Sequence, residues 1–364
     1  MSLGGGLRHR PGRAERDGRR LALALPVGWG GPVPARRRPA RADGDLVAHR
    51  PVSGLVHELS WSASRAANFG TCLRRYYHDY YGSWRGWDAR APEWRRRTYL
   101  LKKMTRMPML AGDCLHRVLA AWIEERGRGR TATAEELEAR AIELLRTGYR
   151  ESRDGSWRAK PAKRTRLAEH HYGEPEIEEA GGAAAEYGGR MVERLRRCVR
   201  HFFALEELEQ ARTIDAEAFL GLEEMGTIEL FGTKVFCIPD FATEVRSEGA
   251  RTIRIYDWKS GRPREADRFQ LAVYVLYARE KWDARPEEVT CSDVYLADGA
   301  VTVERFGSED VDRVERRIAE SMDEMRALHF DADAADGDIG EFAMIADPSS
   351  RECTTCHYRE LCAR

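Results

Sequence analysis

The periodicity of the sequence changes at about Thr213, and this change constrains the fold more than any other feature. Before it, apolar residues recur at helical spacing. After it come short segments rich in Ile, Val, Phe and Thr and separated by glycines, at 214–222, 226–231, 234–245 and 251–258. Such segments are typical of an antiparallel meander. A helix over 265–282, strands at 289–296 and 300–306 and a helix over 309–329 follow, and this order predicts an α/β core.

The region before Thr213 predicts a helical N-terminal extension. Helices are expected over 62–82, with Ser62 or Ser64 as the N-cap, and over 108–126, 134–149 and 183–211, with an irregular segment at 152–182. Residues 1–55 are rich in Gly, Pro and Arg and show neither a helical nor a strand period. We therefore expect them to form a disordered tail.

The composition excludes several classes of protein. Apolar residues make up 42% of the chain, enough for a packed core, and the formal net charge is zero. No stretch approaches the roughly 20 continuous apolar residues that a membrane span needs. Eight unevenly spaced cysteines argue against a secreted disulfide scaffold. We therefore expect a cytoplasmic, reduced protein that does not bind membranes.

The segment from Arg254 to Gly261 holds the candidate catalytic residues. In a strand, residues i and i+2 share a face, so Asp257 and Lys259 project together. A hairpin with the preceding strand would bring Asp240 beside Asp257. Two close carboxylates repel each other unless a cation lies between them, and Mg²⁺ favours sites with one or two carboxylates. A surface hairpin with an Asp257–Lys259 salt bridge is the alternative interpretation.

Pro239 and Asp240, followed after sixteen residues by Asp257-x-Lys259, form the pattern of the PD-(D/E)XK nucleases, which this chain resembles. The resemblance implies a restriction-endonuclease-like core, with a central mixed sheet flanked by helices, and metal-dependent phosphodiester hydrolysis. Asp240 and Asp257 would bind Mg²⁺ or Mn²⁺, and Lys259 would position or deprotonate the attacking water or stabilise the transition state.

Three further residues resemble the RecB-like branch of that superfamily. His116 lies where this branch places a metal-binding histidine, which makes it the third implied metal ligand beside Asp240 and Asp257. Gln270 and Tyr274 match the branch's Gln-x-x-x-Tyr motif. At positions i and i+4 they share one helix face, and the resemblance implies that both support catalysis.

A cysteine run, Cys353-x-x-Cys356 followed by Cys362, closes the chain, and Cys72 lies far upstream. Four thiolates fit either a [4Fe–4S] cluster or tetrahedral Zn²⁺, and spacing alone does not choose between them. A redox dithiol or unliganded thiols are a further alternative. The split arrangement resembles the iron–sulfur staple of the AddB and CRISPR-adaptation nucleases, which implies a [4Fe–4S] cluster that joins the helical extension to the C-terminus. The other four cysteines are expected to be small buried residues.

The resemblance as a whole implies a DNA exonuclease acting on ends or single strands, in DNA repair, recombination or phage defence. Its domain would span 56–364, with a helical insertion at about 127–212, a nuclease core at about 213–330 and the cysteine-containing C-terminus at 350–364. No P-loop motif occurs, so any helicase would be a separate subunit. The alternatives are a non-catalytic iron–sulfur DNA-binding subunit of a helicase–nuclease complex and a zinc-stabilised regulator. The basic and aromatic residues at 84–106 fit either a single-strand channel or a solvated helix face.

Overall fold

The computed structural model describes residues 55–174, 183–334 and 337–362. The tail expected over 1–55 therefore lies outside the described residues, apart from Leu55. A search of the described helices finds none with the length and apolar character that crossing a membrane requires.

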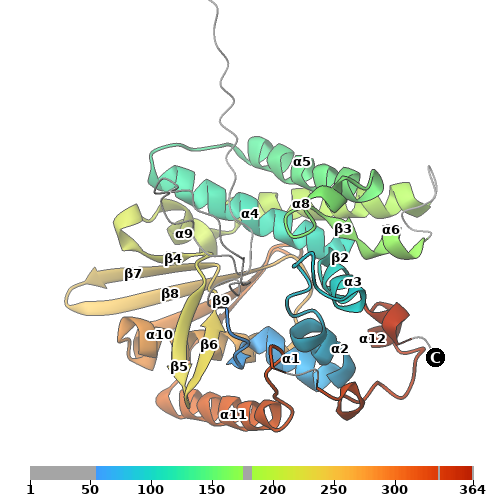
Figure 1. Ribbon diagram of the computed structural model, residues 1–364. Helices are drawn as coiled ribbons and strands as arrows, with labels where there is room; N and C mark the ends of the chain where they lie inside the picture. Colours follow the sequence, from blue (N-terminus) through green and yellow to red (C-terminus); the bar gives the residue numbers. More distant parts are fainter. Residues whose placement is uncertain (1–54, 175–182, 335–336, 363–364) are drawn as a thin grey trace, which may run out of the picture. The chain divides into compact units, whose positions relative to one another are not determined.

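A five-stranded sheet lies at the centre of the structure (Figure 1). Its strand order is β10-β9-β8-β7-β4, and the bounds are β4 (Phe219–Leu222), β7 (Phe241–Ser247), β8 (Ala250–Lys259), β9 (Val289–Tyr295) and β10 (Ala300–Glu304). Strands β8 and β9 are parallel, whereas all other neighbours are antiparallel. Parallel neighbours need a crossover connection, and helix α10 (Glu265–Trp282) supplies it. The expected mixed sheet is thus confirmed.

The segment 234–245, expected as one strand, is two strands in different sheets. A smaller sheet has the order β1-β6-β5, with β1 (Ser60–Trp61), β5 (Gly226–Leu230) and β6 (Thr233–Cys237). The chain leaves this sheet at Cys237 and enters the central sheet at Phe241. Pro239, which has no N–H to donate to a ladder, lies in the break. The expectation of a single meander is therefore wrong, and Asp240 lies where the two sheets diverge.

Three helices predicted from the sequence have the expected bounds to within one or two residues. These are α4 (Met107–Gly127), α10 and α11 (Ser308–Ala327). Helix α5 (Ala134–Arg153) runs one turn further than expected. Thr133 caps α5 through a reciprocal capping box with Glu136, which explains its sharp start.

Other helical predictions need correction. The helix expected over 62–82 begins at its Ser62 N-cap as α1 (Ala63–Thr71) but breaks at Cys72, whose backbone is extended. It resumes as α2 (Leu73–Tyr77) and a π-helical turn over His78–Gly82.

The helix expected over 183–211 ends earlier, as α8 (Ala183–Ala204), and α9 (Glu209–Thr213) follows. The segment 152–182 is not wholly irregular, because it contains β3 (Arg166–Leu167), paired with β2 (Met104–Thr105), and α6 (Ala168–Tyr172). The remaining α-helices in the described part of the chain are α3 (Glu93–Lys102) and α12 (Arg351–Thr354).

Helices cover both faces of the central sheet (Figure 1). On β8, Ile253 and Ile255 pack into a core with α10 and α11, whereas Tyr256 and Trp258 pack into a second core with α4, α5 and α8. Successive strand residues point to opposite faces. The strand that carries the candidate catalytic residues is thus packed against a core on each of its faces.

Candidate active site

The carboxyl end of β8 and the break before β7 bring the two expected aspartates together. Asp240 is only 5% exposed, and its Oδ2 accepts a hydrogen bond of 2.5 Å from the main-chain amide of Trp258. Asp257 is 3% exposed. Its negative charge, after burial itself, is among the causes that raise the pKa of Asp240 to about 7. Two buried carboxylates are therefore close enough to interact, and a bound cation would relieve their repulsion.

Helix α4 brings His116 to Asp240. The Nδ1 atom of His116 lies 3.2 Å from Asp240 Oδ1 and 3.0 Å from Glu223 Oε1. Burial disfavours the charged imidazolium, but the carboxylates of Asp240 and Glu223 outweigh it and raise the pKa of His116 well above its usual value. Ligand atoms of His116, Glu223 and Asp240 all lie within 4.8 Å of one another, so these three residues could hold a metal ion. One nitrogen and two carboxylate ligands suit Mg²⁺ or Mn²⁺.

Glu223 was not expected from the sequence. It follows β4, in the left-handed region with φ of 51°, and its amide donates to the carbonyl of Asp240 at 3.0 Å. That main-chain bond places its carboxylate beside His116. The sequence signal was weak, because an acidic pair at a strand end is common on protein surfaces. Only the pairing of β4 with β7 singles out Glu223.

Lys259, Gln270 and Tyr274 form a connected network with Asp257. The Lys259 ammonium contacts the Asp257 carboxylate and donates to Gln270 Oε1 at 3.1 Å. Gln270 Nε2 donates to the Tyr274 hydroxyl at 2.7 Å, and that hydroxyl lies 3.2 Å from Asp257 Oδ1. The structure thus places these four residues in one chain of contacts. The sequence predicts a metal-ligand group of His116, Asp240 and Asp257. Among the described residues, the group whose ligand atoms lie close together has Glu223 as its third member instead of Asp257.

Comparison with known proteins gives the family. The model of the PD-(D/E)XK nuclease superfamily matches residues 60–363. The chain belongs to this superfamily. No curated protein matches the sequence. Among solved structures, the crystal structure of SSO0001 is similar, with 15% identity over 49% of this chain and 77% of that one. Its TM-score of 0.26 is too low to support an argument about fold or function.

Membership in the PD-(D/E)XK superfamily implies a metal-dependent nuclease. The residues present fit such a cation, because the donor set of His116, Glu223 and Asp240 combines partial burial with two carboxylates. Their excess negative charge would be costly to bury without a positive partner. The chemistry of the site therefore agrees with the family.

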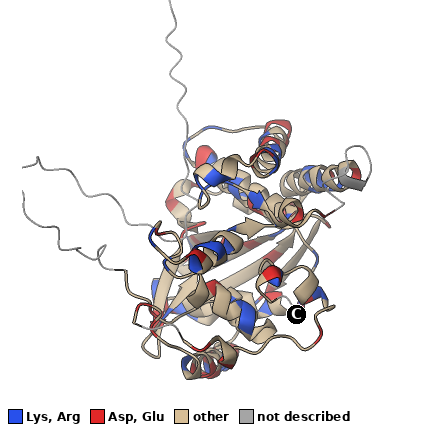
Figure 2. Ribbon diagram, turned by 45° about the vertical axis from the view of Figure 1, so that its right-hand side comes forward, with Lys and Arg blue, Asp and Glu red and all other residues tan. Residues whose placement is uncertain are grey.

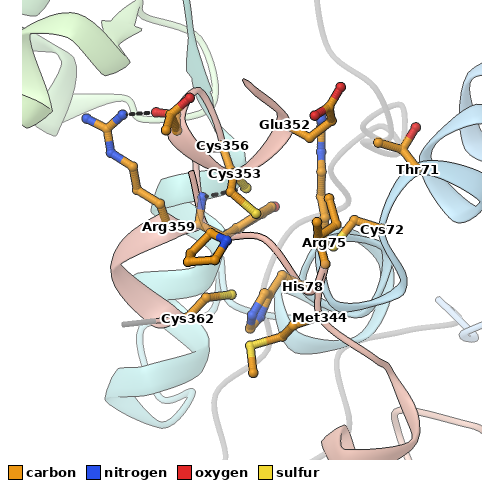
Figure 3. A pocket seen from close by; sticks show the side chains of 14 residues that line it. Thr71, Cys72, Arg75, His78, Met344, Glu352, Cys353, Cys356, Arg359 and Cys362 are labelled. Atoms are coloured by element: carbon orange, nitrogen blue, oxygen red, sulfur yellow. Dashed lines mark hydrogen bonds between the residues drawn. The ribbon is translucent and has the colours of Figure 1, made fainter. Parts of the chain in front are cut away.

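The four cysteines of the split arrangement line one cavity (Figure 3). Its volume is about 450 Å³, and Cys72, Cys353, Cys356 and Cys362 all contribute to its wall. Among the described residues, no three cysteine sulfurs lie within 4.8 Å of one another. The other cysteines, Cys114, Cys198, Cys237 and Cys291, are buried in the cores as expected.

Proposed function

We propose that this PD-(D/E)XK protein is a DNA exonuclease that acts on ends or single strands. Asp240, Asp257 and His116, together with Glu223, would hold Mg²⁺ or Mn²⁺. When bound, the cation supplies positive charge against the phosphate oxygens. The observation that carries the proposal is the group of His116, Glu223 and the buried Asp240 at the end of the strand that bears Asp257.

The proposed roles of the remaining residues follow from their contacts. Lys259 would orient the attacking water or stabilise the charge that develops on the phosphate, because its ammonium lies at the Asp257 carboxylate. Gln270 would hold the ammonium of Lys259. Tyr274 would hold Asp257, since its hydroxyl lies at Asp257 Oδ1.

Digestion of end-labelled linear DNA and closed circular DNA, with Mg²⁺, with Mn²⁺ and with a chelator, tests the activity. Asp257→Ala and Lys259→Ala should each reduce metal-dependent cleavage by about a hundredfold or more. Lys281→Ala, an exposed lysine of α10, is the matched control and should cut normally. Undiminished cleavage by Asp257→Ala would refute the proposed site, and cleavage of circles would argue for endonuclease action.

A structural [4Fe–4S] cluster is proposed on Cys72, Cys353, Cys356 and Cys362, which line one cavity. A zinc ion binds sulfur at about 2.3 Å, which puts tetrahedral sulfurs roughly 3.8 Å apart. Four thiolates fit either metal centre, and the [4Fe–4S] cluster is proposed on the resemblance of the split cysteine arrangement to that of the iron–sulfur nucleases. Protein purified without oxygen should absorb at about 400 nm and contain iron. Stoichiometric zinc without that absorbance would favour the zinc alternative.

A DNA-contact surface is proposed on and before α3. Basic and acidic residues are interspersed over the described helices (Figure 2). Contact with the phosphates of DNA therefore depends on the individual charged side chains at each point of the surface. Trp87 and Trp94 are 49% and 44% exposed, and Arg96 is exposed beside them in sequence. Exposed rings next to cations suit stacking on single-stranded bases. Trp94→Ala should weaken binding of single strands more than that of duplexes.

The domain organisation, cellular context and partners complete the proposal. The nuclease domain would span 56–364, with the helical insertion at about 127–212, the core at about 213–330 and the cysteine-containing C-terminus at 350–364. The protein would act in the cytoplasm, in repair, recombination or phage defence, alone or beside a separate helicase subunit. A second candidate, a non-catalytic iron–sulfur DNA-binding subunit, predicts that wild-type protein binds DNA but never cuts it.

A further inference from the structure

A second pair of aspartates lies behind Lys259. Asp293 on β9 is directly opposite Asp257 in the parallel register of β8 and β9. Asp267 lies in the first turn of α10. The Lys259 ammonium is 3.9 Å from a carboxylate oxygen of each. Lys259 therefore meets carboxylates from three elements, in addition to the amide of Gln270.

Asp293 is a buried carboxylate whose charged neighbours are residues of the candidate active site. Its side chain is only 4% exposed, and among the described residues its Oδ1 has no hydrogen-bond partner. Burial, and then the charge of Asp257, raise the pKa of Asp293 to about 7. A buried carboxylate beside another carboxylate costs free energy of folding. Residues that carry such a cost are often retained for function.

Asp267, by contrast, has a structural role as well. Its Oδ2 accepts hydrogen bonds from the Arg264 amide at 2.9 Å and from the Tyr295 hydroxyl at 3.1 Å. The first of these bonds caps the start of α10. Because these two bonds hold Oδ2, the other carboxylate oxygen, Oδ1, faces Lys259 in a defined position. Loss of Asp267 would therefore mix two effects, whereas loss of the Asp293 charge would not.

We propose that Asp293 is a positioning residue that, with Asp267, holds the Lys259 ammonium between Asp257 and Gln270. The lysine side chain has four rotatable bonds. Without the carboxylates behind it, its ammonium could turn toward solvent or toward the metal ligands. The negative charges at 3.9 Å restrict the ammonium to the end of β8. This inference rests on the proposed nuclease function, since Lys259 acts only in that reaction.

Asp293→Asn tests the inference, because it removes the charge and preserves the volume. We expect kcat for DNA cleavage to fall about tenfold to a hundredfold with an unchanged KM, since DNA contacts are not altered. The midpoint of thermal unfolding should stay the same or rise, because a buried like-charge contact is lost. Glu304→Gln, which removes a carboxylate paired with Arg268 elsewhere in the same sheet, is the control and should keep its kcat.

The outcomes separate the two proposals. A wild-type protein that does not cut DNA with Mg²⁺ or Mn²⁺ would overturn the proposed function and this inference with it. A wild type that cuts while Asp293→Asn keeps full kcat would overturn the inference alone. A lower kcat accompanied by a lower unfolding midpoint would show a merely structural role and would also overturn it.

Discussion

A few buried side chains set the charge of the candidate active site. Burial and the neighbouring charge of Asp257 raise the pKa of Asp240 to about 7, and the same causes raise the pKa of Asp293 to about 7. The pKa of His116 is raised well above its usual value, because Asp240 and Glu223 outweigh the effect of burial. Protons therefore compete with a divalent cation for Asp240 and His116.

This competition predicts that the affinity for Mn²⁺ rises with pH. A raised pKa means that Asp240 and His116 still hold protons at slightly acidic pH, and those protons must leave before the cation binds. As the pH rises through about 7, Asp240 loses its proton and the competition weakens. Calorimetric titration between about pH 6 and pH 8 should show an increase of about tenfold per pH unit for each proton displaced. An affinity that is independent of pH would contradict this assignment.

Glu223 is expected to contribute to the same binding. Glu223→Gln keeps the hydrogen bond to His116 but removes a charge from the metal-ligand group, so Mn²⁺ should bind about tenfold more weakly. Glu224→Gln changes an exposed neighbour and serves as the control. Equal affinities of the two variants, measured by calorimetry, would exclude Glu223 as a ligand.

At the scale of elements, the orientation of α4 decides where His116 lies. The helix has no side-chain cap of its own at Arg106. Instead, Glu169 from α6, which is 1% exposed, accepts a hydrogen bond from the Met107 amide at 2.9 Å and lies 3.7 Å from the Arg106 guanidinium. A buried carboxylate from a distant segment thus satisfies the start of the helix.

Glu169→Ala should therefore destabilise the protein by about 3 kcal/mol, because it leaves the buried Met107 amide without its acceptor and removes one of the two carboxylates beside the Arg106 guanidinium, which keeps its pair with Glu174. Chemical denaturation measures this change. Glu143→Ala is the control, because Glu143 is 59% exposed in its ion pair with Arg150 and should cost less than about 1 kcal/mol. Similar losses for both variants would rule out a special role for Glu169.

At the scale of the described molecule, the C-terminal segment is fastened to the N-terminal helices. The Tyr358 hydroxyl donates to Asp79 Oδ1 at 2.5 Å, and the Arg97 guanidinium pairs with Glu360 at 2.9 Å. The cysteine cavity lies between the same segments, with Cys72 on one side and Cys353 to Cys362 on the other (Figure 3). A metal cluster there would close a very long loop of chain, which stabilises the folded state.

Cys72→Ser and Cys362→Ser should lose the visible absorbance together and lower the unfolding midpoint by similar amounts, because each removes one ligand of the same cluster. Cys198→Ala, which alters a buried core cysteine, should keep the absorbance. Loss of absorbance in only one of the two serine variants would show that the cysteines do not share a cluster.

How well the site can be predicted depends on how far apart in the sequence its interacting residues lie. The shared face of Asp257 and Lys259 follows from strand periodicity alone, and the bounds of α10 follow from its helical pattern. Glu223 and Asp293 could not be predicted in the same way. Their roles depend on which strands pair and in which register. Strand β4 pairs with β7 across the two strands of the smaller sheet that lie between them in the chain, and β8 pairs with β9 across the crossover helix α10.

The sequence by itself determined the local chemistry of this protein. The Pro239–Asp240 and Asp257-x-Lys259 motif indicates the superfamily that the family model confirms, because its two parts can be recognised from short spacings in the sequence. Only the tertiary structure decided what surrounds them. It divided the expected meander into two sheets at Asp240, brought Glu223 to His116, and set Asp293 behind Lys259. The physical reason is that buried charges need partners, and those partners come from segments that only the packing of the sheets and helices brings together.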